Sequence, residues 1–206
     1  MTQDWYPGTL RVSENGARET YGFMQSTFSS DQPICYAEFG IWKADTARRI
    51  CELFPNAVLY LFDFDGNIEA ARQKLAKFGN QIHYFGNTQR YNDSYNWSLM
   101  KLIQQTSGQA IFDYCYLDGA HTVAVDALNF FLCDRLLRVG GYLDFDDYDW
   151  SLAVSSLRPD KVPEILLQYT EEQIEAKQVK MIVDDLVKPD PRYIEVVANK
   201  VFRKIG

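Results

Sequence analysis

The sequence predicts an α/β fold in which a mostly parallel, seven-stranded sheet is covered by helices on both faces. Apolar runs of strand length alternate with helical segments along most of the 206 residues, which is the element order of parallel sheets. These runs lack a clean polar–apolar alternation, as is typical of strands buried on both faces. The last two runs, 193–197 and 201–205, are separated by three residues. Three residues are too few for a crossover helix, so this pair predicts a C-terminal antiparallel hairpin.

The individual elements follow from the spacing of apolar residues and from the chain breakers between them. Residues 122–138 give the clearest helical pattern, because apolar residues recur on one face from Val125 to Leu136, and Gly140 follows the basic end. Ahead of the hairpin, strands are expected at 34–39, 57–62, 81–85, 111–117 and 142–145, and helices at 43–54, 68–78, 95–106, 122–138 and 170–187.

The organisation predicted is one domain over residues 34–206, preceded by an N-terminal flap or helical segment over residues 1–33. The first 33 residues are polar and weakly periodic, whereas the pattern becomes regular from residue 34. The rest of the sequence contains no internal repeat and no low-complexity linker. We therefore expect no second folded domain.

Composition and charge narrow the class of partner. The chain carries 28 Asp and Glu against 21 Lys and Arg, a formal net charge of −7, which disfavours binding to the phosphate backbone of nucleic acid. We expect a small-molecule partner, no nucleic acid and no membrane, since no run approaches the ~20 apolar residues of a membrane span. No signal peptide is visible, and the four cysteines lie in apolar runs, which favours buried free thiols and a cytoplasmic location.

In an open α/β sheet, ligands bind beyond the carboxyl ends of the strands, so the loops there are the candidate site. Gly40 directly follows the first strand and lets the backbone approach a ligand. Asp63 ends the second strand, where a carboxylate can accept the hydroxyls of a ribose, although capping of the next helix explains it equally well. The loop after the third strand, residues 86–89, has small polar side chains that can bond a base edge.

The fourth and fifth strand ends carry an acidic cluster. If the two strands are neighbours, Asp118 meets Asp146 and Asp147, and such carboxylates repel one another unless a cation lies among them. Oxygen ligands without a nearby thiolate select Mg²⁺ or Ca²⁺; the alternative is a set of solvated helix-capping aspartates. His121, one of two histidines, lies three residues after Asp118, where an imidazole can take a proton from a hydroxyl. The other histidine, His83, is expected to pack within a strand.

These loops resemble those of class I S-adenosylmethionine-dependent methyltransferases, a resemblance that covers about residues 34–206. The most specific stretch is F-D-Y-C-Y-L-D-G-A-H at 112–121, followed by Gly-Gly at 140–141 and D-D-Y at 146–148. It is most similar to the bacterial macrocin O-methyltransferase-like and cephalosporin hydroxylase-like group, related to catechol O-methyltransferase. The resemblance implies a Rossmann-like sheet and O-methylation of a small-molecule hydroxyl, with S-adenosylmethionine as cofactor and a divalent cation, Mg²⁺ first.

The resemblance also assigns roles to residues of this sequence. Asp118, Asp146 and Asp147 fall on metal-ligand positions, and His121 falls where relatives have a general base, with Asp118 beside it in the catalytic set. The cofactor-binding positions are Glu38, Gly40 and Trp42 for the methionine part, Asp63 and Phe64 for ribose and adenine, Gly86, Thr88 and Gln89 around the adenine, and Asp118.

The sequence departs from the family pattern in its first loop, and other functions have to be weighed against O-methylation. The family pattern has a glycine where this chain has Ala44. No long capping insertion is visible, so the acceptor pocket must come from residues 1–33 and 148–170 or from a second subunit, which makes a homodimer plausible. A nicotinamide-dependent oxidoreductase is disfavoured because the first loop lacks the G-x-G-x-x-G pattern. A metal-independent methyltransferase and a non-catalytic domain that binds a nucleoside cofactor stay open.

Overall fold

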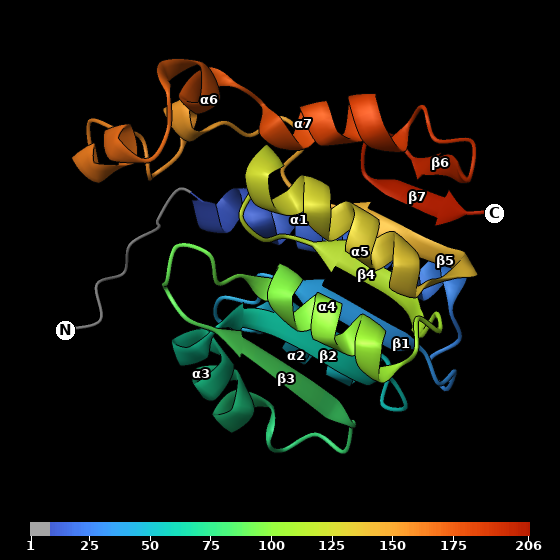
Figure 1. The fold of residues 1–206 in the computed structure, drawn as a ribbon. Helices are drawn as coiled ribbons and strands as arrows, with labels where there is room; N and C mark the ends of the chain where they lie inside the picture. The colour runs from blue at the N-terminus through green and yellow to red at the C-terminus, as the bar shows by residue number, and fades with distance from the viewer. Residues whose placement is uncertain (1–8) are drawn as a thin grey trace.

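The computed structural model describes residues 9–206, with residues 9–16 described as backbone only. Its centre is a seven-stranded sheet in the order β3-β2-β1-β4-β5-β7-β6 (Figure 1). The first five strands are mutually parallel, and β7 runs antiparallel to both β5 and β6. The predicted fold class is therefore confirmed. The strands are β1 Cys35–Phe39, β2 Val58–Phe64, β3 Ile82–Asn87, β4 Phe112–Leu117, β5 Leu137–Phe145, β6 Tyr193–Val197 and β7 Val201–Lys204.

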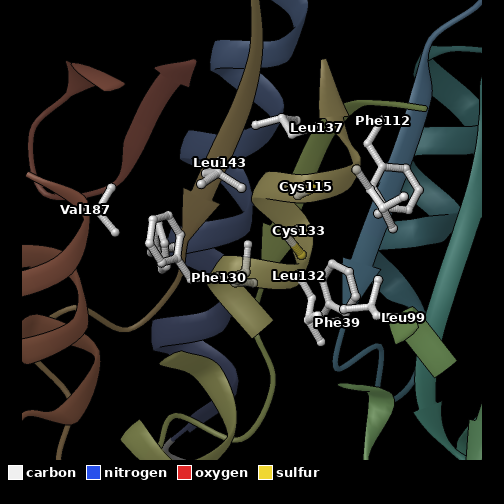
Figure 2. Packing of buried hydrophobic residues seen from close by; sticks show 14 of the residues in the cluster. Phe39, Leu99, Phe112, Cys115, Phe130, Leu132, Cys133, Leu137, Leu143 and Val187 are labelled. Atoms are coloured by element: carbon white, nitrogen blue, oxygen red, sulfur yellow. The ribbon is translucent and has the colours of Figure 1, made fainter. Parts of the chain in front are cut away.

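Helices cover both faces of the sheet, as Figure 1 shows. Buried side chains of α1, α2 and α3 pack in one hydrophobic cluster on one face, and those of α4, α5 and α7 pack in a second cluster on the other. In Figure 2, Phe39 of β1 and Leu99 of α4 lie in this second cluster with Phe130 and Cys133 of α5. The helices are α1 Thr9–Thr27, α2 Asp45–Leu53, α3 Asp65–Leu75, α4 Tyr95–Gln105, α5 Leu128–Leu136, α6 Glu171–Glu175 and α7 Gln178–Ile182.

The boundary between the fifth helix and the fifth strand differs from its prediction. The helix expected over 122–138 begins with a π-helical turn, η1 Val123–Ala127, continues as α5 and ends at Leu136. Strand β5 starts at Leu137, opposite Phe112 of β4, and not at residue 142. Pairing with β4 overrides the local helical pattern, and Gly140, with φ +91°, accommodates the irregular register that follows.

The segment after β5 is also more broken than predicted. The helix expected over 170–187 consists of α6, α7 and a π-helical turn, η4 Val183–Val187. Residues around α6 extend beyond the sheet in Figure 1, and they pack around a small hydrophobic cluster of Leu152, Ile165 and Ile174. Two 3₁₀ turns, η2 Leu152–Val154 and η3 Pro163–Leu167, lie in this segment.

The structure also describes the N-terminal segment, the cysteines and the second histidine. The expected N-terminal segment contains α1, while residues 1–8 lie outside the described residues. All four cysteines are free thiols, and three of them are buried. His83 packs in β3 with its ring stacked on Tyr60, the ring centroids 4.5 Å apart. Among the described residues, no helix combines the length and apolarity needed to cross a membrane.

Candidate functional site

The carboxyl ends of four neighbouring strands are joined directly by backbone hydrogen bonds. The N–H of Gly40, after β1, donates to the carbonyl of Phe62 in β2 at 2.9 Å. The N–H of Asp118, after β4, donates to the carbonyl of Phe39 at 2.9 Å. The N–H of Asp146, after β5, donates to the carbonyl of Leu117 at 3.0 Å. The sheet therefore places the loops after β2, β1, β4 and β5 side by side at one edge, as the sequence predicts.

Gly40 is required where these loops meet. Its φ is +86°, in the left-handed region, and a Cβ built on it would lie 2.0 Å from the backbone oxygen of Asp118. Any larger residue would push the β1 and β4 loops apart.

The carboxylate of Asp63 is hydrogen-bonded within its own chain, unlike a carboxylate that is free to bind a ribose. One carboxylate oxygen accepts from the N–H groups of Ile41 and Trp42 at 2.8 and 2.7 Å. The other accepts from the N–H of Phe64 at 2.6 Å and from the side chain of Asn67 at 3.0 Å. A carboxylate has about four acceptor positions, and all of those on Asp63 are used. Asp63 thus closes the first loop, and a ribose hydroxyl could bind it by displacing the Asn67 side chain.

Glu38 is a buried acidic side chain at the end of β1. It is 1% exposed and accepts a hydrogen bond from the hydroxyl of Tyr36 at 3.1 Å. Burial, with added repulsion from Asp118 and Asp63, raises the pKa of Glu38 well above its ordinary value. The three carboxylates thus share one neighbourhood, and a cationic ligand placed there would relieve their repulsion.

The other residues predicted to bind the cofactor lie at the carboxyl ends of β1, β2 and β3. Trp42 and Phe64 expose 37% and 47% of their surface, so both rings are accessible. Gly86, predicted as the first residue of the loop, lies instead within β3, which continues to Asn87, and it is paired with Asp63 of β2. The hydroxyl of Thr88 donates to Asp93 at 2.6 Å, which holds this side chain within its own turn, and Gln89 is exposed in the same turn.

The imidazole of His121 lies between two of the three predicted metal ligands. Its Nε2 is 3.3 Å from an oxygen of Asp118, and its Nδ1 is 3.5 Å from an oxygen of Asp147. The ring of Trp150 meets it edge-on, with centroids 5.2 Å apart. Both His121 and Asp147 have left-handed backbone angles, φ +55° and +57°. The predicted base and the predicted acidic cluster are therefore in contact.

The electrostatics of this cluster favour bound positive charge. Burial and the charge of Asp146 raise the pKa of Asp118 well above its ordinary value, and the same two causes raise the pKa of Asp147. Burial alone would lower the pKa of His121, but the hydrogen bond and charge of Asp118, together with Asp147, raise it to about 9. The neighbouring carboxylates therefore favour the protonated imidazole, whose positive charge would offset part of the charge of the acidic cluster.

A buried lysine that the sequence did not point to supplies a second cation. Lys200, in the turn between β6 and β7, has its Nζ 2.9 Å from Asp144 and 3.6 Å from Asp146. Asp144 is fully buried and also accepts from the hydroxyls of Thr20 at 2.6 Å and Tyr114 at 2.5 Å. No local pattern signals this contact, since Lys200 is 56 residues from Asp144 in the sequence. Tyr95 and Asp126, which contact the His121 loop, were missed for the same reason.

Comparison with solved structures identifies the architecture that carries this site. A Staphylococcus aureus protein classed with the caffeoyl-CoA O-methyltransferases has a TM-score of 0.59 at 14% identity, covering 92% of this chain and 82% of that one. The N-methyltransferase NodS from Bradyrhizobium japonicum has a TM-score of 0.54 at 14% identity, covering 93% of this chain and 98% of that one. This chain has the fold of the class I S-adenosylmethionine-dependent methyltransferases.

A third methyltransferase structure was determined with ligands. MycE, from the mycinamycin biosynthetic pathway, in complex with Mg and SAH, has a TM-score of 0.53 at 16% identity over 92% of this chain. This chain spans 48% of the length of MycE. No family model matches the sequence, and no curated protein matches it.

The acidic cluster of this methyltransferase fold has the kind of donor atoms that a divalent cation binds. All three predicted ligands are carboxylates, the oxygen donors that Mg²⁺ prefers, and the Oδ2 atom of Asp146 is buried without a hydrogen-bond partner. Among the side chains of residues 17–206, however, no three acidic, His or Cys residues converge as metal ligands, and Asp118 and Asp147 each have an oxygen close to His121. The oxygen donors suit Mg²⁺, and Asp118 and Asp147 each have only one of their two oxygens next to His121.

Proposed function

We propose that this chain is an S-adenosylmethionine-dependent methyltransferase that methylates a hydroxyl oxygen of a small molecule with the help of Mg²⁺. The observation that carries the proposal is the single edge of the methyltransferase sheet at which Gly40, Glu38, Asp63, Asp118 and His121 meet. The residues that we propose for the nucleoside (the cofactor half) and the pair of His121 and Asp118 (the acceptor half) lie side by side there. This is the arrangement that transfer between a bound cofactor and a hydroxyl needs.

The cofactor half suits a ligand that is both polar and cationic. S-adenosylmethionine supplies an electrophilic methyl group on a positively charged sulfur and a cationic amino group. Glu38 and Asp118 provide buried negative charge near the first loop, and Gly40 keeps that loop close to the β4 end. The accessible rings of Trp42 and Phe64 provide apolar surfaces beside Asp63, where an adenine can stack.

The acceptor half suits removal of one proton from a hydroxyl. S-adenosylmethionine would supply the methyl group and leave as S-adenosylhomocysteine, and the proton of the acceptor hydroxyl would go to a neutral His121. Asp118 orients the imidazole through its Nε2. Mg²⁺ held by Asp118, Asp146 and Asp147 would lower the pKa of the hydroxyl. The ring of Trp150 lies edge-on to His121, and it would flank an acceptor bound beside the imidazole.

Metal-independent methylation is a second candidate, favoured by the cations already present in the chain. His121 lies between Asp118 and Asp147, and Lys200 is 3.6 Å from Asp146. Each of the three carboxylates is therefore close to a positive group of the protein itself, which reduces the need for a bound ion.

Titration calorimetry with S-adenosylhomocysteine tests the cofactor site. We expect binding to the wild-type chain, loss of at least about tenfold in affinity for Asp63→Ala, since it loses hydrogen bonds to ligand and loop together, and little change for His121→Ala. Absence of heat with the wild-type chain would contradict the proposed function. Equal binding by both variants would show that the cofactor lies elsewhere.

A second titration, with Mg²⁺ alone, separates the two mechanisms. The metal-assisted mechanism predicts saturable binding to the wild-type chain, weakened at least about tenfold by Asp147→Asn, which removes one charged ligand. Asp160→Asn is the control, because that carboxylate is exposed and pairs with Arg158. If Mg²⁺ does not bind, and activity on an acceptor survives EDTA, the metal-independent mechanism holds.

A further inference from the structure

Two buried side chains hold the turn that carries His121. Tyr95 is the first residue of α4, and Asp126 lies in the π-helical turn η1; they are 7% and 5% exposed. The hydroxyl of Tyr95 donates to one oxygen of Asp126. The same hydroxyl accepts from the N–H of Ala120 at 3.2 Å, and the other oxygen of Asp126 accepts from the N–H of Thr122 at 3.2 Å. The pair therefore binds the backbone amides on both sides of His121.

The backbone at His121 needs such support. Its φ of +55° is left-handed, a conformation that is strained in a residue other than glycine and persists where surrounding contacts enforce it. The loop also packs tightly on Tyr95, since a Cβ built on Gly119 would lie 2.5 Å from the Tyr95 hydroxyl oxygen. The contact leaves no room for the loop to shift toward α4.

The π-helical turn joins the same support to α4. The side-chain amide of Asn96 donates to the carbonyl of Val125 at 2.9 Å, one residue before Asp126. The N–H of Asp126 donates to the carbonyl of Thr122 at 2.8 Å. Turns of this kind are rare and occur frequently at functional sites. The start of α4 and the turn η1 thus form one unit around the His121 loop.

We infer that Tyr95 and Asp126 are positioning residues for His121, which hold its left-handed turn so that the imidazole lies between Asp118 and Asp147. The inference rests on the proposed function for its catalytic meaning. Their hydrogen bonds end on backbone amides of the loop and not on the imidazole. Their hydrogen bonds therefore act through the position of the loop, and the negative charge of Asp126 also raises the pKa of the imidazole.

The imidazole signals of His121 in an NMR spectrum test this inference without an assay of activity. The chain has two histidines, so His83, stacked on Tyr60 in β3, serves as the internal reference. We expect Tyr95→Phe, which removes one oxygen atom, to move or split the His121 ring signals while those of His83 stay in place. Asp126→Asn, as a second variant, should change the same signals.

Tyr193→Phe is the matched control. Tyr193 is also a buried tyrosine whose hydroxyl donates to an aspartate, Asp134, at 2.6 Å, but it lies in β6, away from the His121 loop. It should lose stability as Tyr95→Phe does and leave the His121 signals unchanged. The inference is overturned if Tyr95→Phe and Asp126→Asn leave those signals as in the wild type, or if neither variant folds, since a positioning role predicts folded chains.

The same samples separate this inference from the proposed function. S-adenosylhomocysteine affinity should stay within about threefold of the wild-type value in Tyr95→Phe, a difference of less than 1 kcal/mol, because the hydroxyl of Tyr95 bonds Asp126 and Ala120 and none of Glu38, Gly40 and Asp63. If the wild-type chain does not bind S-adenosylhomocysteine, the proposed function fails, while a moved His121 signal still supports the positioning role.

Discussion

At the scale of single residues, the site depends on a close contact between two loops at Gly40. Two features separately favour glycine at this position: its φ is left-handed, and a Cβ built on it would lie 2.0 Å from the carbonyl oxygen of Asp118. Either feature alone would disfavour alanine, and relief of both needs movement of the backbone. Since Asp118 is also the residue that contacts His121, a shift there would spread from the cofactor half to the acceptor half.

We therefore expect Gly40→Ala to lower the free energy of unfolding by about 2 kcal/mol or more, and to weaken S-adenosylhomocysteine binding at least about tenfold. Urea unfolding and calorimetry on the same sample measure the two effects. Gly22→Ala is the control, because it lies within α1 and a Cβ there meets nothing within 4 Å. That substitution should be neutral or stabilise by up to about 1 kcal/mol.

At the scale of elements, α5 is the helix whose packing sets the position of the strands beneath it. Phe130, labelled in Figure 2, is fully buried, and its ring contacts those of Tyr193 in β6 and Phe145 in β5. The neighbouring Phe131 is 51% exposed. The two phenylalanines thus differ in burial while sharing one helix.

Replacing each of these phenylalanines with alanine should show how much stability comes from the burial of Phe130, because both substitutions change the helix propensity of α5 in the same way. Phe130→Ala is expected to cost about 3–5 kcal/mol of unfolding free energy, because it removes buried surface and leaves a cavity. Phe131→Ala should stay within about 1 kcal/mol, and chemical denaturation of both variants checks the difference. Equal losses would mean that Phe130 is not a core anchor.

The hairpin of β6 and β7 is held to α5 by the carboxylate of Asp134. Tyr193 donates to it at 2.6 Å, and Arg192 and Lys204 pair with it at 2.7 and 3.0 Å. Burial raises the pKa of Asp134, but the hydrogen bonds of Tyr193, Arg192 and Lys204 outweigh it, so the pKa lies below its ordinary value. A carboxyl group with a lowered pKa in the folded state stabilises the fold above its unfolded pKa of about 3.9.

Asp134→Asn should therefore destabilise the chain in a pH-dependent way. We expect a loss of about 2 kcal/mol between pH 5 and 8, from weakened hydrogen bonds to a charged group, and a shrinking difference from the wild type as the pH falls below about 4. Urea unfolding at several pH values measures it, with the exposed Asp160→Asn as control. A difference that does not depend on pH would rule out the charge of Asp134 as the cause.

At the scale of the whole molecule, the sequence predicts well what depends on local pattern. Strand and helix order, the hairpin and the shared edge of Asp63, Asp118 and His121 follow from periodicity and from the rule for strand ends. The start of β5 at Leu137 was not predictable, because its pairing with Phe112 of β4 competes with a strong helical pattern. Contacts such as Tyr95 with Asp126 join polar residues from separate elements, and no local spacing encodes them.

Some of the acidic side chains behind the net charge of −7 lie together in the fold. Acidic side chains gather at the carboxyl edge of the sheet, and Lys200 reaches into that edge from the turn between β6 and β7. Its partner Asp144 also bonds Thr20 of α1 and Tyr114 of β4. One buried ion pair thus links the N-terminal helix, the centre of the sheet and the C-terminal hairpin.

Breaking that pair should affect the whole fold. Lys200→Met leaves Asp144 as a buried charge without its cation, which is expected to cost about 3–5 kcal/mol of unfolding free energy. Adding Asp144→Asn removes the stranded charge and keeps an oxygen for Thr20 and Tyr114, so the double variant should regain at least about 1 kcal/mol. Urea unfolding of the wild type, both single variants and the double variant measures this coupling. Additive losses would show that Lys200 and Asp144 do not interact, and that the acidic edge is neutralised by some other group.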